Sequence, residues 1–207
     1  MFKTIIEHTT SEIVEKKSKF IANIYHIENE EQANTKIKEI KKKYYDARHN
    51  CIAFRVIEKD KIIEKFSDDG EPSGTAGAPM LNILQKNDLC NILVVVTRYF
   101  GGILLGTGGL VRAYSEATIQ GIEKADKINV YQGMEYKVKL EYSELENLKY
   151  YCRKNSINIT NIEYINEINC NIQVKEENNN KLKKDIEEKR INILEYKHIK
   201  EVFMEEK

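Results

Sequence analysis

Three carboxylates lie close together in one short segment, where they could bind a metal or carry out acid–base chemistry. The segment DDGEPSGTAGAP begins at Asp68 and also contains Asp69 and Glu71. A hard cation would need several further converging oxygen ligands, and the sequence offers no obvious set. Adjacent aspartates in a loop commonly bond their own backbone and so fix a turn. We favour the turn and expect no metal.

The same segment is rich in residues with special backbone preferences. It contains both prolines of the chain, and eight of the chain's ten glycines lie between Gly70 and Gly109. Proline fixes φ, whereas glycine reaches positive φ without a steric penalty. We therefore expect a shaped loop, which is more typical of a recognition surface than of a linker.

A second glycine-rich run, RYFGGILLGTGGLVR, follows an apolar segment and precedes an expected helix. Backbone amides in this context can bind an anion. A dinucleotide fingerprint fails because Val111 stands where its third glycine should be, and a P-loop fails because Thr107 replaces the lysine. Two interpretations stay open. The amides of residues 106–109, with Arg98 and Arg112, bind a phosphate or carboxylate, or the glycines allow close backbone packing.

His49 and Cys51 are two residues apart at the start of an apolar segment, so in a strand they would share a face. A cysteine nucleophile with a histidine base would need this proximity. No orienting carboxylate can be assigned, and an apolar strand favours a buried, structural Cys51. We predict no catalytic residue and no cofactor, and we keep His49 as a secondary site candidate.

Composition limits the classes of partner. The chain has 207 residues, 41% of them hydrophobic, with 33 basic and 33 acidic side chains, so no global charge favours nucleic acid or membrane. Four scattered cysteines and a start without a secretory pattern predict reduced thiols in a cytosolic protein. No apolar run approaches the roughly 20 residues that span a bilayer, so we expect no membrane partner.

Up to about residue 130 the pattern alternates between strand and helix. We expect a pair of strands joined at a lysine-rich turn, a helix, a hairpin across EKDK, a helix starting at Ala78 and a final helix starting at Leu110. Between the last two helices, ILVVVT has no alternation, which predicts a central strand buried on both faces.

From about Met134 the periodicity restarts as strand, helix, two strands, helix and strand. In EYKVKLEY, Tyr136 and Val138 share one face while Lys137 and Lys139 share the other, as in a half-buried strand. The order β-α-β-β-α-β predicts a ferredoxin-like domain. We therefore expect an α+β protein with domains at 1–132 and 133–207.

Four motifs, KKSKFIA, ARHNC, SDDGEPSGTAGAPML and TRYFGGILLGTGGLVRAYSEA, resemble in order and spacing the IMPACT (YigZ-type) family. This resemblance implies a first domain like domain two of ribosomal protein S-five, followed by the ferredoxin-like domain. Tyr44 departs from the family pattern, in which a histidine precedes ARHNC, so His49 stands without a histidine partner.

The tandem of domains is similar to the last two domains of elongation factor G, and related eukaryotic proteins restrain a stress kinase during translation control. The resemblance therefore implies a regulatory binding protein that contacts RNA, the ribosome or translation factors. A fold alone does not fix a function, so an enzyme or binding protein for a small phosphorylated or carboxylated ligand is the alternative. A third interpretation is a protein-interaction module that uses the ferredoxin-like sheet.

The expected RNA- or anion-binding surface combines the shaped loop, the Arg/Tyr corner and the glycine turn, since arginine and amides suit phosphate and tyrosine suits base stacking. Its residues are Asp68, Asp69, Glu71, Ser73, Thr75, Arg98, Tyr99, Gly101, Gly102, Gly106, Thr107, Gly108, Gly109 and Arg112.

Overall fold

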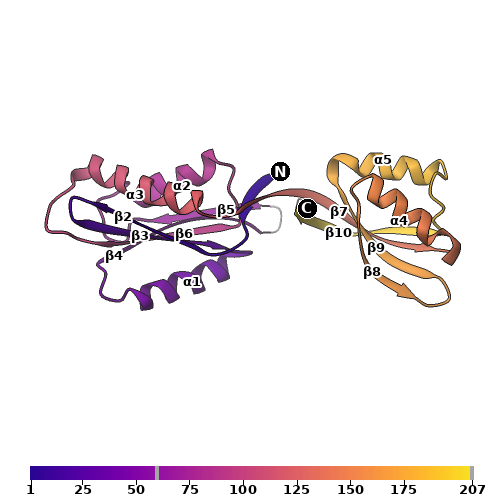
Figure 1. Ribbon diagram of the computed structural model, residues 1–207, viewed down its shortest axis with the longest axis horizontal. Helices are drawn as coiled ribbons and strands as arrows, with labels where there is room; N and C mark the ends of the chain where they lie inside the picture. The colour runs from indigo at the N-terminus through magenta and orange to yellow at the C-terminus, as the bar shows by residue number, and fades with distance from the viewer. Residues whose placement is uncertain (59–60, 206–207) are drawn as a thin grey trace. The chain divides into compact units, whose positions relative to one another are not determined.

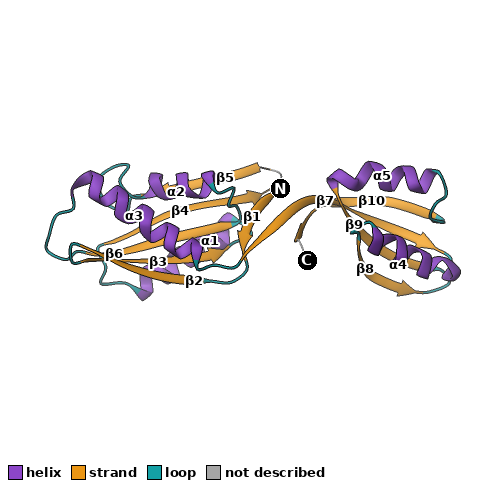
Figure 2. Ribbon diagram, turned by 45° about the horizontal axis from the view of Figure 1, so that its top comes forward, coloured by secondary structure: helices purple, strands orange, loops and turns teal. Residues whose placement is uncertain are grey.

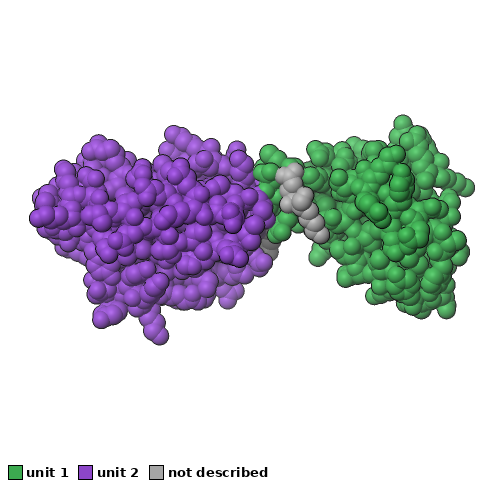
Figure 3. Space-filling model, viewed as in Figure 1, with its two compact units in different colours: residues 1, 129–207 green, residues 2–128 purple. Residues whose placement is uncertain are grey.

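The structure is a computed structural model that describes residues 1–58 and 61–205, and the chain divides into two compact units. The N-terminal unit comprises residues 2–128, and the C-terminal unit comprises residue 1 with residues 129–207, drawn in purple and green in Figure 3. The division falls four residues before the boundary expected from periodicity. The strand β7, Lys127–Leu140, runs through this region, which explains why the sequence pattern restarts only later.

The N-terminal unit is a five-stranded sheet with helices on both faces (Figures 1 and 2). The strand order is β2-β3-β6-β4-β5, and every neighbouring pair is antiparallel. Its elements are β1 (Phe2–Ile5), β2 (Thr9–Glu15), β3 (Ser18–His26), α1 (Glu30–Lys43), β4 (His49–Glu58), β5 (Lys61–Ser67), α2 (Gly77–Lys86), β6 (Ile92–Tyr99) and α3 (Gly106–Glu123).

The strand β6 is central in this sheet and buried on both faces, as its unbroken apolar run predicts. Val94 and Val96 belong to the core beneath α2 and α3, whereas Leu93 and Val95 belong to the core beneath α1. Alternate residues of β6 therefore pack into two hydrophobic cores, one on each face of the sheet. Because β6 is held by a strand on each side and by a core on each face, its last residues, where the glycine-rich run begins, are held in place.

The helix α1 shows how local sequence sets an element's bounds. The side chain of Asn29 accepts a hydrogen bond from the Gln32 amide and caps the first turn. Two acids open the helix and three lysines, Lys41 to Lys43, close it, which matches the helix dipole.

Two features of the N-terminal unit differ from expectation. The short strand β1 was not predicted, because its hydrogen bonds are to residues that are distant in the sequence. Lys3 donates to the Asp88 carbonyl and accepts from the Cys90 amide. The helix α3 begins at Gly106 rather than at Leu110. The hairpin turn expected across EKDK includes residues 59 and 60, which lie outside the described residues.

The C-terminal unit has the expected order β-α-β-β-α-β, with both helices on one face of an antiparallel sheet (Figure 1). Within this unit the strands lie in the order β10-β7-β9-β8, which is the ferredoxin-like arrangement. After β7 the elements are the 3₁₀ turn η1 (Tyr142–Glu144), α4 (Leu145–Lys154), β8 (Asn158–Tyr164), β9 (Ile168–Lys175), α5 (Glu176–Glu187) and β10 (Glu195–Glu205). The fold class predicted from the sequence, α+β with two domains, is confirmed.

Candidate functional site

The shaped loop after β5 begins with a tight turn. Asp69 and Gly70 both have positive φ, 44° and 88°, and the Glu71 amide donates to the Asp68 carbonyl at 2.9 Å. Positive φ at both central positions is the pattern of a type I′ turn, for which Asp-Gly is favoured. The turn directs the Glu71 side chain into the protein, where it is only 8% exposed.

Asp68 holds the loop against the start of α2. Its carboxylate accepts three backbone hydrogen bonds, from Gly74 at 2.8 Å, Ala76 at 3.0 Å and Gly77 at 2.8 Å. The N-cap residue Ala76 has no side chain that could cap the helix, so Asp68 supplies this function from eight residues upstream. The Asp68 carboxylate therefore stabilises the loop and is not left for a metal.

Asp69 and His49 join this loop to the start of β4. The Asp69 carboxylate accepts from the Asn50 amide at 2.7 Å and from Lys41 at 2.7 Å. His49 Nδ1 lies 2.9 Å from the Asp69 carbonyl, and because a carbonyl only accepts, Nδ1 carries the proton. The ring is thereby oriented, with Nε2 as its remaining hydrogen-bonding atom.

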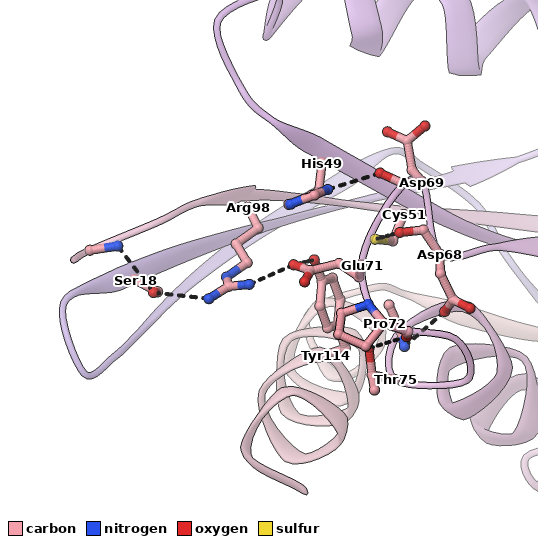
Figure 4. A network of polar contacts seen from close by, with 12 residues as sticks. Ser18, His49, Cys51, Asp68, Asp69, Glu71, Pro72, Thr75, Arg98 and Tyr114 are labelled. Atoms are coloured by element: carbon pink, nitrogen blue, oxygen red, sulfur yellow. Dashed lines mark hydrogen bonds and ion pairs between the residues drawn. The ribbon is translucent and has the colours of Figure 1, made fainter. Parts of the chain in front are cut away.

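Glu71 is the centre of a buried polar network (Figure 4). One of its oxygens accepts from Arg98 at 2.7 Å and from the Tyr114 hydroxyl at 2.8 Å. Arg98 also reaches Ser18 Oγ at 3.5 Å, and its guanidinium lies about 5.5 Å from the Phe20 ring centre. Burial is the largest cause that raises the pKa of the Tyr114 hydroxyl, so this residue stays a proton donor.

This network differs from the expected role of Arg98. We expected Arg98 to offer charge to an anion and Glu71 to lie at the rim, but Arg98 is 6% exposed and paired with Glu71. The reason is register: Arg98 lies opposite Phe20 on one side and His49 on the other, so its side chain points to the face beneath α3. Its Nε has no hydrogen-bond partner within the described residues.

The two neighbouring glycines after β6 have different roles. A Cβ on Gly101 would lie 2.0 Å from the carbonyl carbon of Lys17, so only glycine allows this backbone approach. Gly102 faces open space but has φ 83°. The Gly101 amide also donates to Ser18 Oγ at 3.2 Å, which ties the loop after β6 to the turn between β2 and β3.

The run from Gly106 to Gly109 forms the first turn of α3 instead of a separate glycine turn. This turn has no capping side chain at Leu105 and no acidic residue, so within the described residues neither its cap nor its first turn supplies a side-chain acceptor for its first amides. Thr107 and Gly108 are exposed, and Arg112 folds back over this turn, with a guanidinium nitrogen 3.7 Å from a Cβ placed on Gly108.

The remaining candidate residues lie in the loop and at the end of β6. Ser73 is exposed, whereas Thr75 is buried and donates to the Pro72 carbonyl at 2.7 Å. Tyr99 donates to the Asp46 carboxylate at 2.7 Å, and this hydrogen bond is the main cause that raises the pKa of its hydroxyl to about 12.

Cys51 lies on the same strand face as His49, but it is fully buried. Its thiol donates to the Asp68 carbonyl at 3.0 Å, and burial raises its pKa to about 12. The thiolate required for nucleophilic chemistry is therefore strongly disfavoured. All four cysteines are free and buried, and no group of three metal-binding side chains occurs in the described ranges 1–58 and 61–205.

A cluster of cations lies at this end of the sheet; the sequence predicted only one of them, Arg112, as a site residue. We call this cluster the basic rim; its members are exposed and make no ion pair with any described residue. The members are Lys16, Lys17, Lys42, Lys43, Arg48 and Arg112. They share one end because the first residues of β3 and β4 pair with the last residues of β6. Scattered over 97 positions, they form no sequence motif.

Exposed apolar side chains accompany the basic rim. Phe100 is 52% exposed and Leu104 is 83% exposed in the loop that follows β6, and Tyr45 is 85% exposed before β4. In contrast, the acids of the loop are engaged by the protein itself. The surface thus presents cations and rings rather than the carboxylates of the loop.

The fold and this site define a two-domain α+β protein. Its glycine- and proline-rich motif forms a loop at one end of the N-terminal sheet. The family model described as the Impact N-terminal domain matches residues 16–122. The IMPACT family member YvyE of Bacillus subtilis is 36% identical over 96% of both chains. This chain therefore belongs to the IMPACT family.

Solved structures give two further similarities. A crystal structure of a hypothetical protein is 30% identical and covers 96% of this chain and 97% of its own, with a TM-score of 0.62. The translational regulator Yih1 is 28% identical and covers 55% of this chain and 46% of its own, with a TM-score of 0.38. Within the described parts of this chain, no helix combines the length and apolar character needed to cross a membrane.

Proposed function

We propose that this chain is a non-enzymatic, cytoplasmic binding protein that regulates translation by contacting RNA or the ribosome through the basic rim. The family resemblance supports the translational setting, because related eukaryotic proteins act in translation control. The observation that supports the RNA contact is a difference between acidic and basic side chains at this end of the sheet. The acids of the loop are bonded within the protein, whereas the cations of the basic rim form no ion pair with any described residue.

The three acids of the shaped loop are engaged within the protein. Asp68 caps α2, Asp69 is held by Lys41 and the Asn50 amide, and Glu71 is buried against Arg98. The six cations of the basic rim have no ion-pair partner among the described residues, and they outnumber the exposed acids Glu15 and Asp46 at the same end, although the chain is neutral overall. Cations beside exposed rings suit phosphate contact and base stacking.

The shaped loop then has a supporting role in this proposal. Its internal hydrogen bonds hold β4, β6 and α2 in place, and the glycine contact at Gly101 fixes the turn that carries Lys16 and Lys17. A rigid backbone lowers the entropic cost of binding a partner. The site residues expected from sequence would thus position the contact surface, while the basic rim makes the contact.

The second candidate is a small phosphorylated or carboxylated ligand at the start of α3. The specific observation that favours it is the first turn of an 18-residue helix, which has neither a capping side chain nor an acid and lies beside Arg112. Titration of inorganic phosphate against the full chain, followed by amide chemical shifts of residues 106–109, tests this candidate.

Co-sedimentation with ribosomes at low and raised salt tests the main proposal. We expect the double variant Lys17→Gln and Arg112→Gln to bind more weakly and to lower the slope of log affinity against log salt by about 1.5, because two phosphate contacts are lost. Both substitutions keep the side chain polar and leave the glycines and the buried network intact.

The matched control is Lys86→Gln with Lys124→Gln, which removes two exposed lysines at the far ends of α2 and α3. It should sediment as the unmodified chain does. If the Lys17 and Arg112 double variant keeps the affinity and the salt slope of the unmodified chain, the basic rim is not the contact surface.

A further inference from the structure

The sheet of the C-terminal unit has one face that its helices do not cover. The helices α4 and α5 pack on the face that carries Tyr136, Val138 and Leu140 (Figure 1). Alternation places the other residues of each strand on the open face. These residues are Glu135, Lys137 and Lys139 of β7, Asn169, Asn171 and Gln173 of β9, Asn158 and Thr160 of β8, and Glu195, Lys197 and Lys200 of β10.

Two lysines lie directly opposite each other on this face. Lys137 of β7 pairs in register with Lys197 of β10, and both side chains are exposed. Cβ atoms of directly opposed residues lie about 4.5 to 5.5 Å apart, and like charges at such positions are destabilising. The strands therefore carry a repulsion that folding alone does not require.

No acid among the described residues of the open face forms an ion pair with either lysine. Glu135 accepts from Asn171 at 2.8 Å and lies 3.7 Å from Lys200, and Glu167 pairs with Lys139. Glu195 lies opposite Lys139 in the register. Lys137 and Lys197 have no ion pair with any residue of the described chain, so the pair is a local excess of positive charge.

Neutral polar groups continue this row across the sheet. Asn171 lies next to Lys137 in the register, and Thr160 lies next to Asn171, so one residue from each of four strands forms a transverse row. The row offers two cations and the Asn171 amide, which also donates to Glu135, but no aromatic ring. Such a surface suits the phosphate and sugar groups of a nucleic-acid backbone better than it suits stacked bases.

We propose that the open sheet face of the C-terminal unit docks the phosphate backbone of RNA, with Lys137 and Lys197 as its two phosphate contacts. The inference rests on the proposed function for the class of partner, but it assigns a surface that lies apart from the basic rim in the sequence and in a different unit. Contact with phosphates would neutralise the opposed lysines and relieve their repulsion.

Binding of a fluorescein-labelled oligouridylate to the full chain, measured by anisotropy at several salt concentrations, tests the inference. The double variant Lys137→Gln and Lys197→Gln should bind more weakly, with a salt slope lower by about 1.4 for two lost contacts on a single strand. Its melting temperature should stay the same or rise, because the substitutions remove a repulsion. Weaker binding without loss of stability separates a contact role from a structural one.

The matched control is Lys154→Gln with Lys183→Gln, two exposed lysines on α4 and α5 of the same unit. It should bind as the unmodified chain does. Equal loss in the control, or unchanged affinity and slope in the Lys137 and Lys197 variant, overturns the inference. Equal affinity for a polyglutamate peptide also overturns it, since the surface would then recognise negative charge without phosphate.

The two proposals fail in different ways. If the oligouridylate assay depends on Lys17 and Arg112 but not on Lys137 and Lys197, the basic rim survives and the open face is rejected. If the dependence is reversed, the open face survives and the rim is rejected. Failure of the unmodified chain to bind the oligouridylate rejects the inference, whereas ribosome sedimentation still decides the proposed function.

Discussion

Arg98 and Lys137 are both cations on strands that have a neighbouring strand on each side, yet the two units use them in opposite ways. Arg98 is buried and joined to Glu71 at 2.7 Å, whereas Lys137 is exposed and opposed by a second lysine. Arg98 belongs to a conspicuous motif, and Lys137 belongs to an ordinary alternating strand. The conspicuous motif therefore serves to fix the backbone, whereas the charge of Lys137 remains available to a partner.

The buried pair gives the largest expected effect. Glu71→Ala leaves the Arg98 guanidinium uncompensated and removes the acceptor of Tyr114, so the free energy of unfolding should fall by about 3–5 kcal/mol. Denaturant unfolding measures this loss. Replacing Glu71 and Arg98 together with Met should cost less than Glu71→Ala, because no charge is then buried alone.

An outcome in which Glu71→Ala unfolds like the unmodified chain would remove the contrast between the two units. Arg98 would then be able to reach solvent by rotating, and its charge would again be a candidate for anion binding. Ribosome sedimentation of the same variant distinguishes these cases, because a released Arg98 should strengthen binding and steepen the salt slope.

Much of the fold could be predicted from local pattern. The central strand β6 follows from its apolar run, and the C-terminal unit follows from period-two strands between amphipathic helices. The strand β1 could not be predicted, since the backbone groups that bond to Lys3 belong to residues 88 and 90, which are distant in the sequence. The start of α3 was placed too late because glycine weakens a helix without excluding it from the first turn.

The candidate site was harder to predict than the fold. The turn at Asp69 and Gly70 follows from residue type, since both tolerate positive φ. The pairing of Glu71 with Arg98 spans 27 residues, and no local rule joins them. The basic rim is assembled from a hairpin turn, a helix end and a helix start, so only the register of β3, β6 and β4 brings its members to one end.

A smaller effect is expected at Cys51, and here the two units should agree. Burial raises the pKa of Cys51 and of Cys152 to about 12, from an ordinary value of 9.0. Because the folded state holds the proton more tightly, the thiol's contribution to stability is full below pH 9 and is lost as pH rises toward 12. Cys51→Ala should cost about 1 kcal/mol at pH 7, with the difference shrinking above pH 9.

Unfolding curves of the unmodified chain and of Cys51→Ala at pH 7 and pH 10 measure this dependence. RNA or ribosome binding should be unchanged in the variant, since the thiol is buried and bonded to the Asp68 carbonyl. Rapid alkylation of native Cys51 near pH 8 would contradict the structural role, because a thiol with a pKa near 12 is almost entirely protonated there.

The smallest effect is expected at a surface ion pair of the C-terminal unit, between Lys139 and Glu167. Their side chains are 39% and 33% exposed, so water and salt screen the pair. Glu167→Gln should therefore leave the free energy of unfolding almost unchanged, and raised salt should remove any small difference. The same substitution frees Lys139 beside Lys137, so oligouridylate affinity should rise slightly if the open face binds phosphate. A loss of several kcal/mol would show that an exposed ion pair stabilises this sheet as strongly as the buried pair of Glu71 and Arg98 stabilises the N-terminal unit. The contrast between buried charges in one unit and exposed charges in the other would then be wrong.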